Sequence, residues 1–228
     1  MQNESNYTLN TVLCFIEFLV HNGLQYGSIM NYVSGIRSIF RWFQITDKHF
    51  DNVRVSLLLK AVATTVRPVP KFKGLFTSDD LKRIICVTST MPLASIFKTI
   101  YLFAFFGFFR ISNLVATTCS DFDASKQLCR ADVVVNEAYL IILVKWSKTL
   151  QQSRQGSYIM LPRLLGSNIC PWQAYRQMSQ SEPSGANAPL FVCNGTPITQ
   201  SQVRAHLSKV NRVLGLDPTT HTFHTFRR

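Results

Sequence analysis

Residues 99–110 read TIYLFAFFGFFR, eleven residues without a charge followed by an arginine. The run is too short to span a bilayer, which needs about 20 apolar residues, and Lys98 stands directly before it. We therefore expect residues 93–109 to form a helix buried in the core of a domain. Arg110 must then reach water along its stem or meet an anion, because an unpaired guanidinium is costly to bury.

The residues on either side of this run extend the helical pattern. Apolar spacing predicts helices over residues 80–88 and 111–118. Thr77 and Asp80 stand three apart, as in a capping box that begins a helix, and Phe76 and Leu81 are placed to form its hydrophobic staple.

The pattern then changes to short runs of β-branched and aromatic residues at 129–135, 138–145 and 157–161. We interpret them as a three-stranded antiparallel sheet. The polar residues 146–156 form the tip of its second hairpin and include Lys148. Helical spacing returns at residues 171–178 and 199–214, the latter begun by Thr199 and ended by Gly215.

Before the capping box, the chain has a separate helical pattern. Apolar residues recur at helical spacing over residues 8–22, 26–44 and 51–66. Residues 67–74 read RPVPKFKG, whose prolines and glycine prevent a continuous helix. The predicted fold class is mainly α (α+β), with a helical N-terminal domain over residues 1–66. A basic linker, 67–75, joins it to a mixed helical domain with the small sheet, 76–228.

Composition limits the class of protein. Of the 228 residues, 46% are hydrophobic and 16% charged, which favours a packed core over disorder. The net charge is +12, and residues 138–228 hold ten basic and only two acidic residues. Such a charge attracts polyanions, and duplex DNA is the predicted partner. The candidate DNA contacts are Arg37, Arg41, Arg67, Lys71, Lys73, Lys145 and Arg154.

The cysteines and the N-terminus indicate an intracellular protein. The six cysteines include no C-x-x-C pair, and we interpret them as reduced, packed thiols. The first ten residues lack the basic and apolar regions of a signal peptide. A metal site built from His206, His221 and His224 is disfavoured, because no cysteine pair or carboxylate is suitably spaced.

Three features carry candidate chemistry, in the order Arg110, Lys148 and the C-terminal H-x-x-R of His224 and Arg227. One helical turn would place that histidine and arginine on the same face. Each feature alone has an ordinary explanation: a helix-end arginine, a solvated hairpin lysine, a basic end. Two further segments support an interpretation of the three features as one set. They are Pro189-Leu-Phe191 and, before a helix, Gly195-Thr-Pro-Ile-Thr199.

In this order the features resemble the tyrosine recombinase (phage integrase-like) family, nearest in appearance to recombinases of eukaryotic mobile elements. The resemblance covers essentially the whole chain. Residues 1–66 are similar to its helical core-binding (SAM-like) domain and residues 76–228 to its catalytic domain. It implies DNA integration and recombination inside the cell, in the nucleus for a eukaryotic protein, with self-assembly on DNA as a dimer or tetramer.

The resemblance also assigns roles. Arg110 and Arg227 would clamp the non-bridging phosphate oxygens, Lys148 would give a proton to the leaving 5′-oxygen, and His224 would share proton transfer with the nucleophile. Because two guanidinium groups supply the positive charge, the resemblance implies no metal or other cofactor.

Two positions depart from the family pattern. Asn113 stands where the family usually has an acidic residue. The attacking tyrosine follows H-x-x-R in the family, whereas all seven tyrosines of this sequence precede His224. We interpret the chain as a recombinase truncated before its nucleophile. The alternatives are a DNA-binding remnant that does not cut, or a helical scaffold that binds protein.

Overall fold

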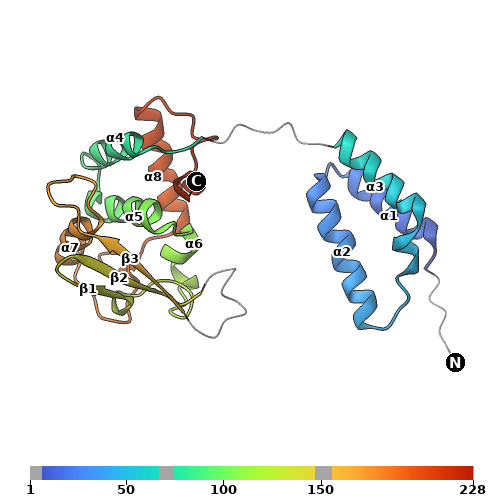
Figure 1. Ribbon diagram of the computed structural model, residues 1–228, viewed down its shortest axis with the longest axis horizontal. Helices are drawn as coiled ribbons and strands as arrows, with labels where there is room; N and C mark the ends of the chain where they lie inside the picture. Colours follow the sequence, from blue (N-terminus) through green and yellow to red (C-terminus); the bar gives the residue numbers. More distant parts are fainter. Residues whose placement is uncertain (1–6, 67–73, 147–155, 228) are drawn as a thin grey trace. The chain divides into compact units, whose positions relative to one another are not determined.

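The computed structural model describes residues 7–66, 74–146 and 156–227. The chain forms two compact units, Met1–Lys71 and Phe72–Arg228. Most of the described residues are helical, and a three-stranded antiparallel sheet lies in the second unit (Figure 1). The expected fold class, mainly helical with this small sheet, is confirmed. Within the described ranges, no helix has both the length and the apolar character needed to cross a bilayer.

The first unit contains the helices α1 (Leu9–His21), α2 (Tyr26–Trp42) and α3 (Val53–Thr65). All three lie close to the predicted segments, and their apolar faces meet in one core that includes Ile16 and Ile29. A 3-10 turn, η1 (Lys48–Asp51), precedes α3. The predicted helix start at residue 51 was early, because the Asn52 side chain accepts a hydrogen bond from the Arg54 amide and caps α3 there.

The second unit contains five further helices around one larger core. They are α4 (Ser78–Thr88), α5 (Ala94–Gly107), α6 (Ile111–Leu114), α7 (Pro171–Ser181) and α8 (Gln200–Val213). Its 3-10 turns are η2 (Cys119–Asp121), η3 (Arg130–Asp132) and η4 (Phe223–Arg227).

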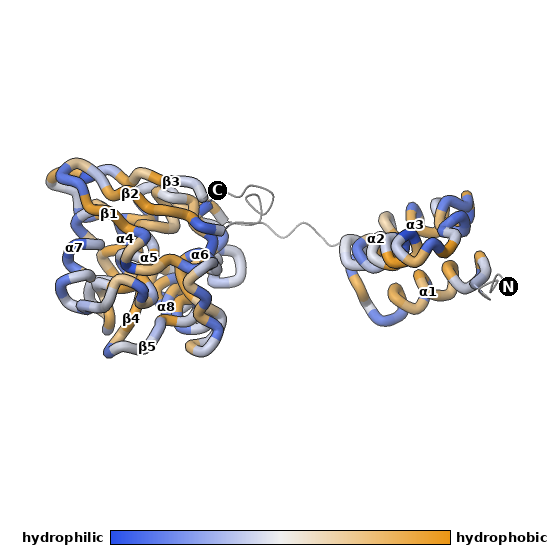
Figure 2. Tube along the Cα trace, turned by 90° about the horizontal axis from the view of Figure 1, so that it is seen from below, coloured by the Kyte–Doolittle hydropathy of each residue, from blue (hydrophilic) through white to orange (hydrophobic). Residues whose placement is uncertain are grey.

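Helix α5 is the predicted core helix. Its residues Ile100, Leu102 and Phe103 are completely buried, and Figure 2 shows α5 as a largely hydrophobic segment inside the unit. The capping box of Thr77 and Asp80 forms as predicted and begins α4. The apolar run therefore forms the centre of the domain, as its composition required.

The sheet has the order β1 (Val133–Val135), β2 (Tyr139–Val144), β3 (Ser157–Pro162), with both pairs antiparallel. The first predicted strand was too long. The Cys129 amide donates to the Asp132 carboxylate at 2.6 Å, and this contact folds Arg130–Asp132 into η3. The sequence analysis also missed a short ribbon of β4 (Val192–Cys193) and β5 (Thr196–Pro197).

The helix predicted over residues 111–118 is mostly wrong. Only α6, a single turn, forms, and the backbone becomes extended at Val115. Ala116 instead forms a parallel bridge with Thr199, at the start of α8. The pairing of Ala116 with Thr199 thus takes the place of the predicted helix. The same pairing brings the start of α8 beside the residues that follow α6.

The cysteines were only partly interpreted correctly. All six are free thiols, but Cys14, Cys86 and Cys119 are exposed rather than packed. Cys170 is buried, and its sulfur accepts a hydrogen bond from the Gln173 amide at the start of α7.

Candidate active site

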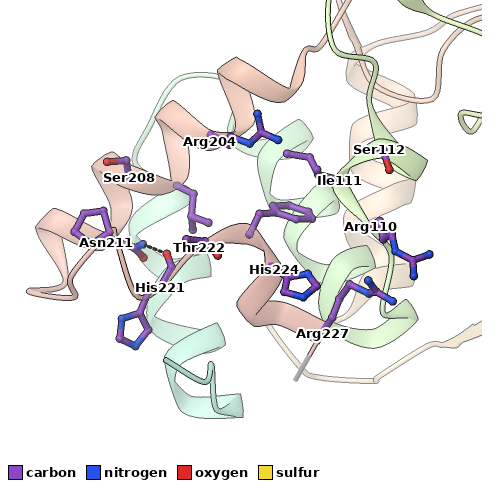
Figure 3. A pocket seen from close by; sticks show the side chains of 13 residues that line it. Arg110, Ile111, Ser112, Arg204, Ser208, Asn211, His221, Thr222, His224 and Arg227 are labelled. Atoms are coloured by element: carbon purple, nitrogen blue, oxygen red, sulfur yellow. Dashed lines mark hydrogen bonds between the residues drawn. The ribbon is translucent and has the colours of Figure 1, made fainter. Parts of the chain in front are cut away.

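A pocket of about 510 Å³ brings together three of the four predicted catalytic residues. Arg110 enters from the segment between α5 and α6, and His224 and Arg227 enter from η4. Figure 3 shows the side chains of His224 and Arg227 beside that of Arg110 at one end of the pocket. The remaining lining residues are Ile111, Ser112, Arg204, Leu207, Ser208, Asn211, Pro218, His221, Thr222 and Phe223.

The end of α5 sets the position of Arg110. Phe108 has a positive φ of 51°, which ends the helix and turns the chain. Arg110 then occupies the N-cap position of α6, where its amide donates to Asn113 Oδ1 at 3.2 Å. Asn113 Nδ2 donates in turn to the Trp146 carbonyl at 2.8 Å. Asn113 is 5% exposed. Its two hydrogen bonds therefore connect the Arg110 backbone to Trp146, which follows β2 and stands two residues before Lys148 in the sequence.

Asn113 accepts one hydrogen bond and donates another, and this combination requires an amide side chain at position 113. We expect Asn113→Asp to lose about 1 kcal/mol of unfolding free energy, because a carboxylate cannot donate to the Trp146 carbonyl. Urea unfolding of the two proteins measures the difference. Asn136→Asp is the matched control, since Asn136 Oδ1 only accepts a hydrogen bond from the Ala138 amide. Equal losses at both positions would contradict the role of Asn113.

Aromatic packing holds η4 in place. Phe226 is buried, with its ring centroid 4.6 Å from that of Phe76 and 5.4 Å from that of Tyr101. With Phe226 directed into the core, His224 is exposed and Arg227 half-buried at the pocket. The turn is a 3-10 helix, in which residues three apart lie on the same face. The H-x-x-R spacing therefore places both residues on the pocket side.

Positive charge is concentrated in this pocket. Burial, and then the charge of Arg110, lower the pKa of Arg227. The Nε–H of Arg227 donates to the Phe108 carbonyl at 2.5 Å, and this bond orients its guanidinium group. Two guanidinium groups that repel one another across a shared pocket form a site for an anion, and phosphate oxygens suit their planar donors.

The sequence analysis missed the contribution of α8. Arg204, Ser208 and Asn211 recur at helical spacing and line the pocket opposite η4 (Figure 3). The same spacing was visible in the sequence, but the segment was interpreted only as a helix. Arg204 adds a third cation, and its guanidinium donates to Gln200 Oε1 at 2.9 Å.

The structure describes only three of the other predicted residues. Lys148, Arg67, Lys71, Lys73 and Arg154 fall outside the described residues. The remaining three bind carboxylates: Arg37 faces Asp47 and Asp51, Arg41 faces Asp47, and Lys145 faces Asp132 at 2.5 Å. Their contacts with DNA stay a prediction.

No tyrosine lines the pocket in the part of the chain that the structure describes. Tyr101 and Tyr175 are buried in the core. Burial raises the pKa of the Tyr101 hydroxyl far above its usual value. Likewise, within residues 7–66, 74–146 and 156–227, no group of three histidines, cysteines or carboxylates is placed to hold a metal ion.

The fold of this chain is similar to that of tyrosine recombinases and integrases of known structure. Known structures of that class cover nearly the whole chain. The integrase of transposon Tn1549, in complex with circular intermediate DNA, has a TM-score of 0.55 and 16% identity over 98% of this chain and 71% of its own. The XerH recombinase bound to its difH substrate has a TM-score of 0.60 and 15% identity, over 97% of this chain and 58% of that chain.

A lambda integrase tetramer bound to a Holliday junction gives a TM-score of 0.55 and 16% identity, over 97% of this chain and 58% of its own. The sequence matches no protein-family profile, and no curated protein resembles it in sequence. The likeness therefore concerns the fold.

Proposed function

We propose that this chain binds duplex DNA and holds one phosphodiester in the pocket for strand cleavage and rejoining of the tyrosine recombinase type. One observation carries the proposal. Arg110 and Arg227 are far apart in sequence, yet they line one pocket with His224 and are close enough for the charge of one to lower the pKa of the other.

The residues take distinct roles in this reaction. Attack on phosphorus places negative charge on the non-bridging oxygens, and the guanidinium groups of Arg110 and Arg227 stabilise it. His224 transfers a proton at the attacking oxygen, and Lys148 protonates the leaving 5′-oxygen.

Each part of the chain contributes to the DNA complex. Residues 1–66 are the proposed core-binding domain, 67–75 the linker that crosses phosphates, and 76–228 the catalytic domain. The integrase and recombinase structures named above contain DNA, and one of them is a tetramer. This supports self-assembly on DNA for the present chain, inside the cell and, for a eukaryotic mobile element, in the nucleus.

The nucleophile divides the proposal into two forms. In the first, a tyrosine following His224 in a longer chain attacks the phosphorus. In the second, the chain occupies DNA without cutting it. Both forms require the phosphate contacts.

Titration of duplex DNA against single variants tests these contacts. We expect Arg227→Ala and Arg110→Ala each to weaken binding about tenfold, because each loses a charge-assisted contact to phosphate. Arg212→Ala is the matched control, since Arg212 is exposed near the end of α8 but does not line the pocket.

Affinity for the unsubstituted chain should also fall steeply as salt rises. Equal losses for Arg227→Ala and Arg212→Ala would reject the pocket as the phosphate site. Binding that is weak and insensitive to salt would favour the protein-binding scaffold.

A further inference from the structure

The first described residues of the second unit pack against the turn that carries the candidate catalytic histidine and arginine. Gly74 is buried, and its amide donates to the Thr220 carbonyl at 3.1 Å. Phe76 lies 5.4 Å from the His221 ring and 4.6 Å from the Phe226 ring, between centroids. Gly74 and Phe76 therefore pack beside His221, which lines the pocket, and against η4.

The contact between Gly74 and His221 leaves no room for a side chain. A Cβ at position 74 would lie 2.5 Å from His221 Cδ2 and 2.7 Å from Cε1, closer than real Cβ contacts. Gly74 has no positive φ, so the backbone conformation does not explain the glycine. The close approach of the imidazole ring does.

Two contacts hold the His221 ring in its position beside Gly74. Its Nδ1 lies 3.0 Å from Thr220 Oγ1 and 3.3 Å from the Asp217 carbonyl. The His221 carbonyl accepts a hydrogen bond from the completely buried Asn211 at 2.6 Å. Displacement of the ring would break its two Nδ1 contacts, and displacement of the His221 backbone, which leads into η4, would break the bond from Asn211.

The Thr220 carbonyl connects the two sides of this contact. It accepts from the Gly74 amide and also from Thr225 Oγ1, at 3.4 Å. Thr225 stands between His224 and Arg227 in the sequence. One acceptor thus joins the end of the linker to the turn that carries both residues.

We propose that Gly74 and His221 are positioning residues, whose close contact sets the placement of Arg227 and His224 at the pocket. The inference rests on the proposed function, because it concerns residues that would hold the phosphate. According to this inference, the position of Gly74 against His221 determines whether the Arg227 guanidinium reaches that phosphate. Phosphate contacts depend on placement within about half an ångström, and the Gly74→Ala overlap exceeds that.

Coupling between positions 74 and 227 in DNA binding tests the inference on the full chain. With Gly74 present, Arg227→Ala is expected to weaken duplex binding about tenfold. With Gly74→Ala, the same change should cost less than about twofold, because Arg227 is already displaced. Adding His221→Ala removes the overlap and should restore most of the Arg227 effect.

Gly185→Ala is the matched control, because a Cβ there meets nothing within 4 Å and Gly185 has no positive φ. It should leave the Arg227 effect unchanged. Melting curves show whether each variant is folded. If Gly74→Ala is too unstable to titrate, His221→Tyr, which enlarges the ring against an unchanged Gly74, should abolish the Arg227 effect in the same way.

The outcomes separate the inference from the function on which it rests. A tenfold Arg227 effect in both the Gly74 and Gly74→Ala proteins overturns the positioning role and keeps the phosphate site. No Arg227 effect in the unsubstituted protein rejects the phosphate site itself. Failure of His221→Ala to restore the Arg227 effect in the Gly74→Ala protein also overturns the inference, because it would show that the ring is not what Gly74 accommodates.

Discussion

From the proposed function, we expect a nicked suicide DNA substrate to leave no covalent adduct on residues 1–228 and a 3′-phosphotyrosyl adduct on a longer chain that carries a tyrosine after Arg228. Covalent catalysis needs a nucleophile in line with the leaving oxygen, and the charges of Arg110 and Arg227 cannot replace it. All seven tyrosines precede His224, and none lines the pocket among the described residues.

In the extended chain, loss of Arg110 or Arg227 should slow adduct formation by about 10²–10³, by analogy with the removal of one oxyanion-hole donor. Denaturing gels of the adduct over time give the rate, and Arg212→Ala serves again as the control. An adduct on the 228-residue chain would mean that an existing tyrosine attacks. No adduct on the extended chain would favour the DNA-binding protein that does not cut.

The stability of the second unit is expected to fall by about 2 kcal/mol between pH 7.5 and 5.0 through one histidine. His206 is 9% exposed, its Nδ1 lies 2.8 Å from the Tyr101 hydroxyl, and its ring stacks on Phe97 at 3.9 Å. Burial, and then the charge of Lys209, lower the pKa of His206 to about 4.

The sign follows from proton binding. Below pH 6.5 the unfolded chain protonates this histidine, but the folded chain does not until the pH nears 4. Folding therefore loses stability as the pH falls through this window, and at higher pH the histidine is neutral in both states.

Urea unfolding at several pH values measures the slope. His206→Asn keeps a polar partner for Tyr101 without a titrating ring, so its stability should depend less on pH. His21→Asn, at an exposed histidine of α1, should leave the slope unchanged. A slope that is equal in the His206→Asn protein would place the pH dependence elsewhere.

The parts of the site that sequence alone predicted are those fixed by local pattern. Arg110 was predicted because eleven uncharged residues precede it, and His224 and Arg227 because their spacing fits one helical turn. The capping box of Thr77 is equally local. The local structure around these residues needed only the periodicity of a few neighbours, whereas their grouping as a catalytic set came from their order along the chain and the family resemblance.

The parts that it did not predict depend on contacts between distant segments. Residues 115–118 left the helix because Ala116 pairs with Thr199, and Asn113 acquired its role from the Trp146 carbonyl. The approach of Gly74 to His221 joins residues almost 150 positions apart. Such tertiary contacts override local propensity and carry no signal in a single sequence.

Phe108 has a left-handed backbone conformation, so stability favours glycine at position 108, whereas the orientation of Arg227 favours phenylalanine. A bulky residue at positive φ costs of order 1 kcal/mol that glycine would avoid. Yet the carbonyl of Phe108 is the group that orients the Arg227 guanidinium, and a more mobile glycine backbone would hold it less firmly. Selection for a more heat-resistant protein would therefore favour glycine at position 108, whereas selection for the proposed phosphate contact of Arg227 would keep phenylalanine.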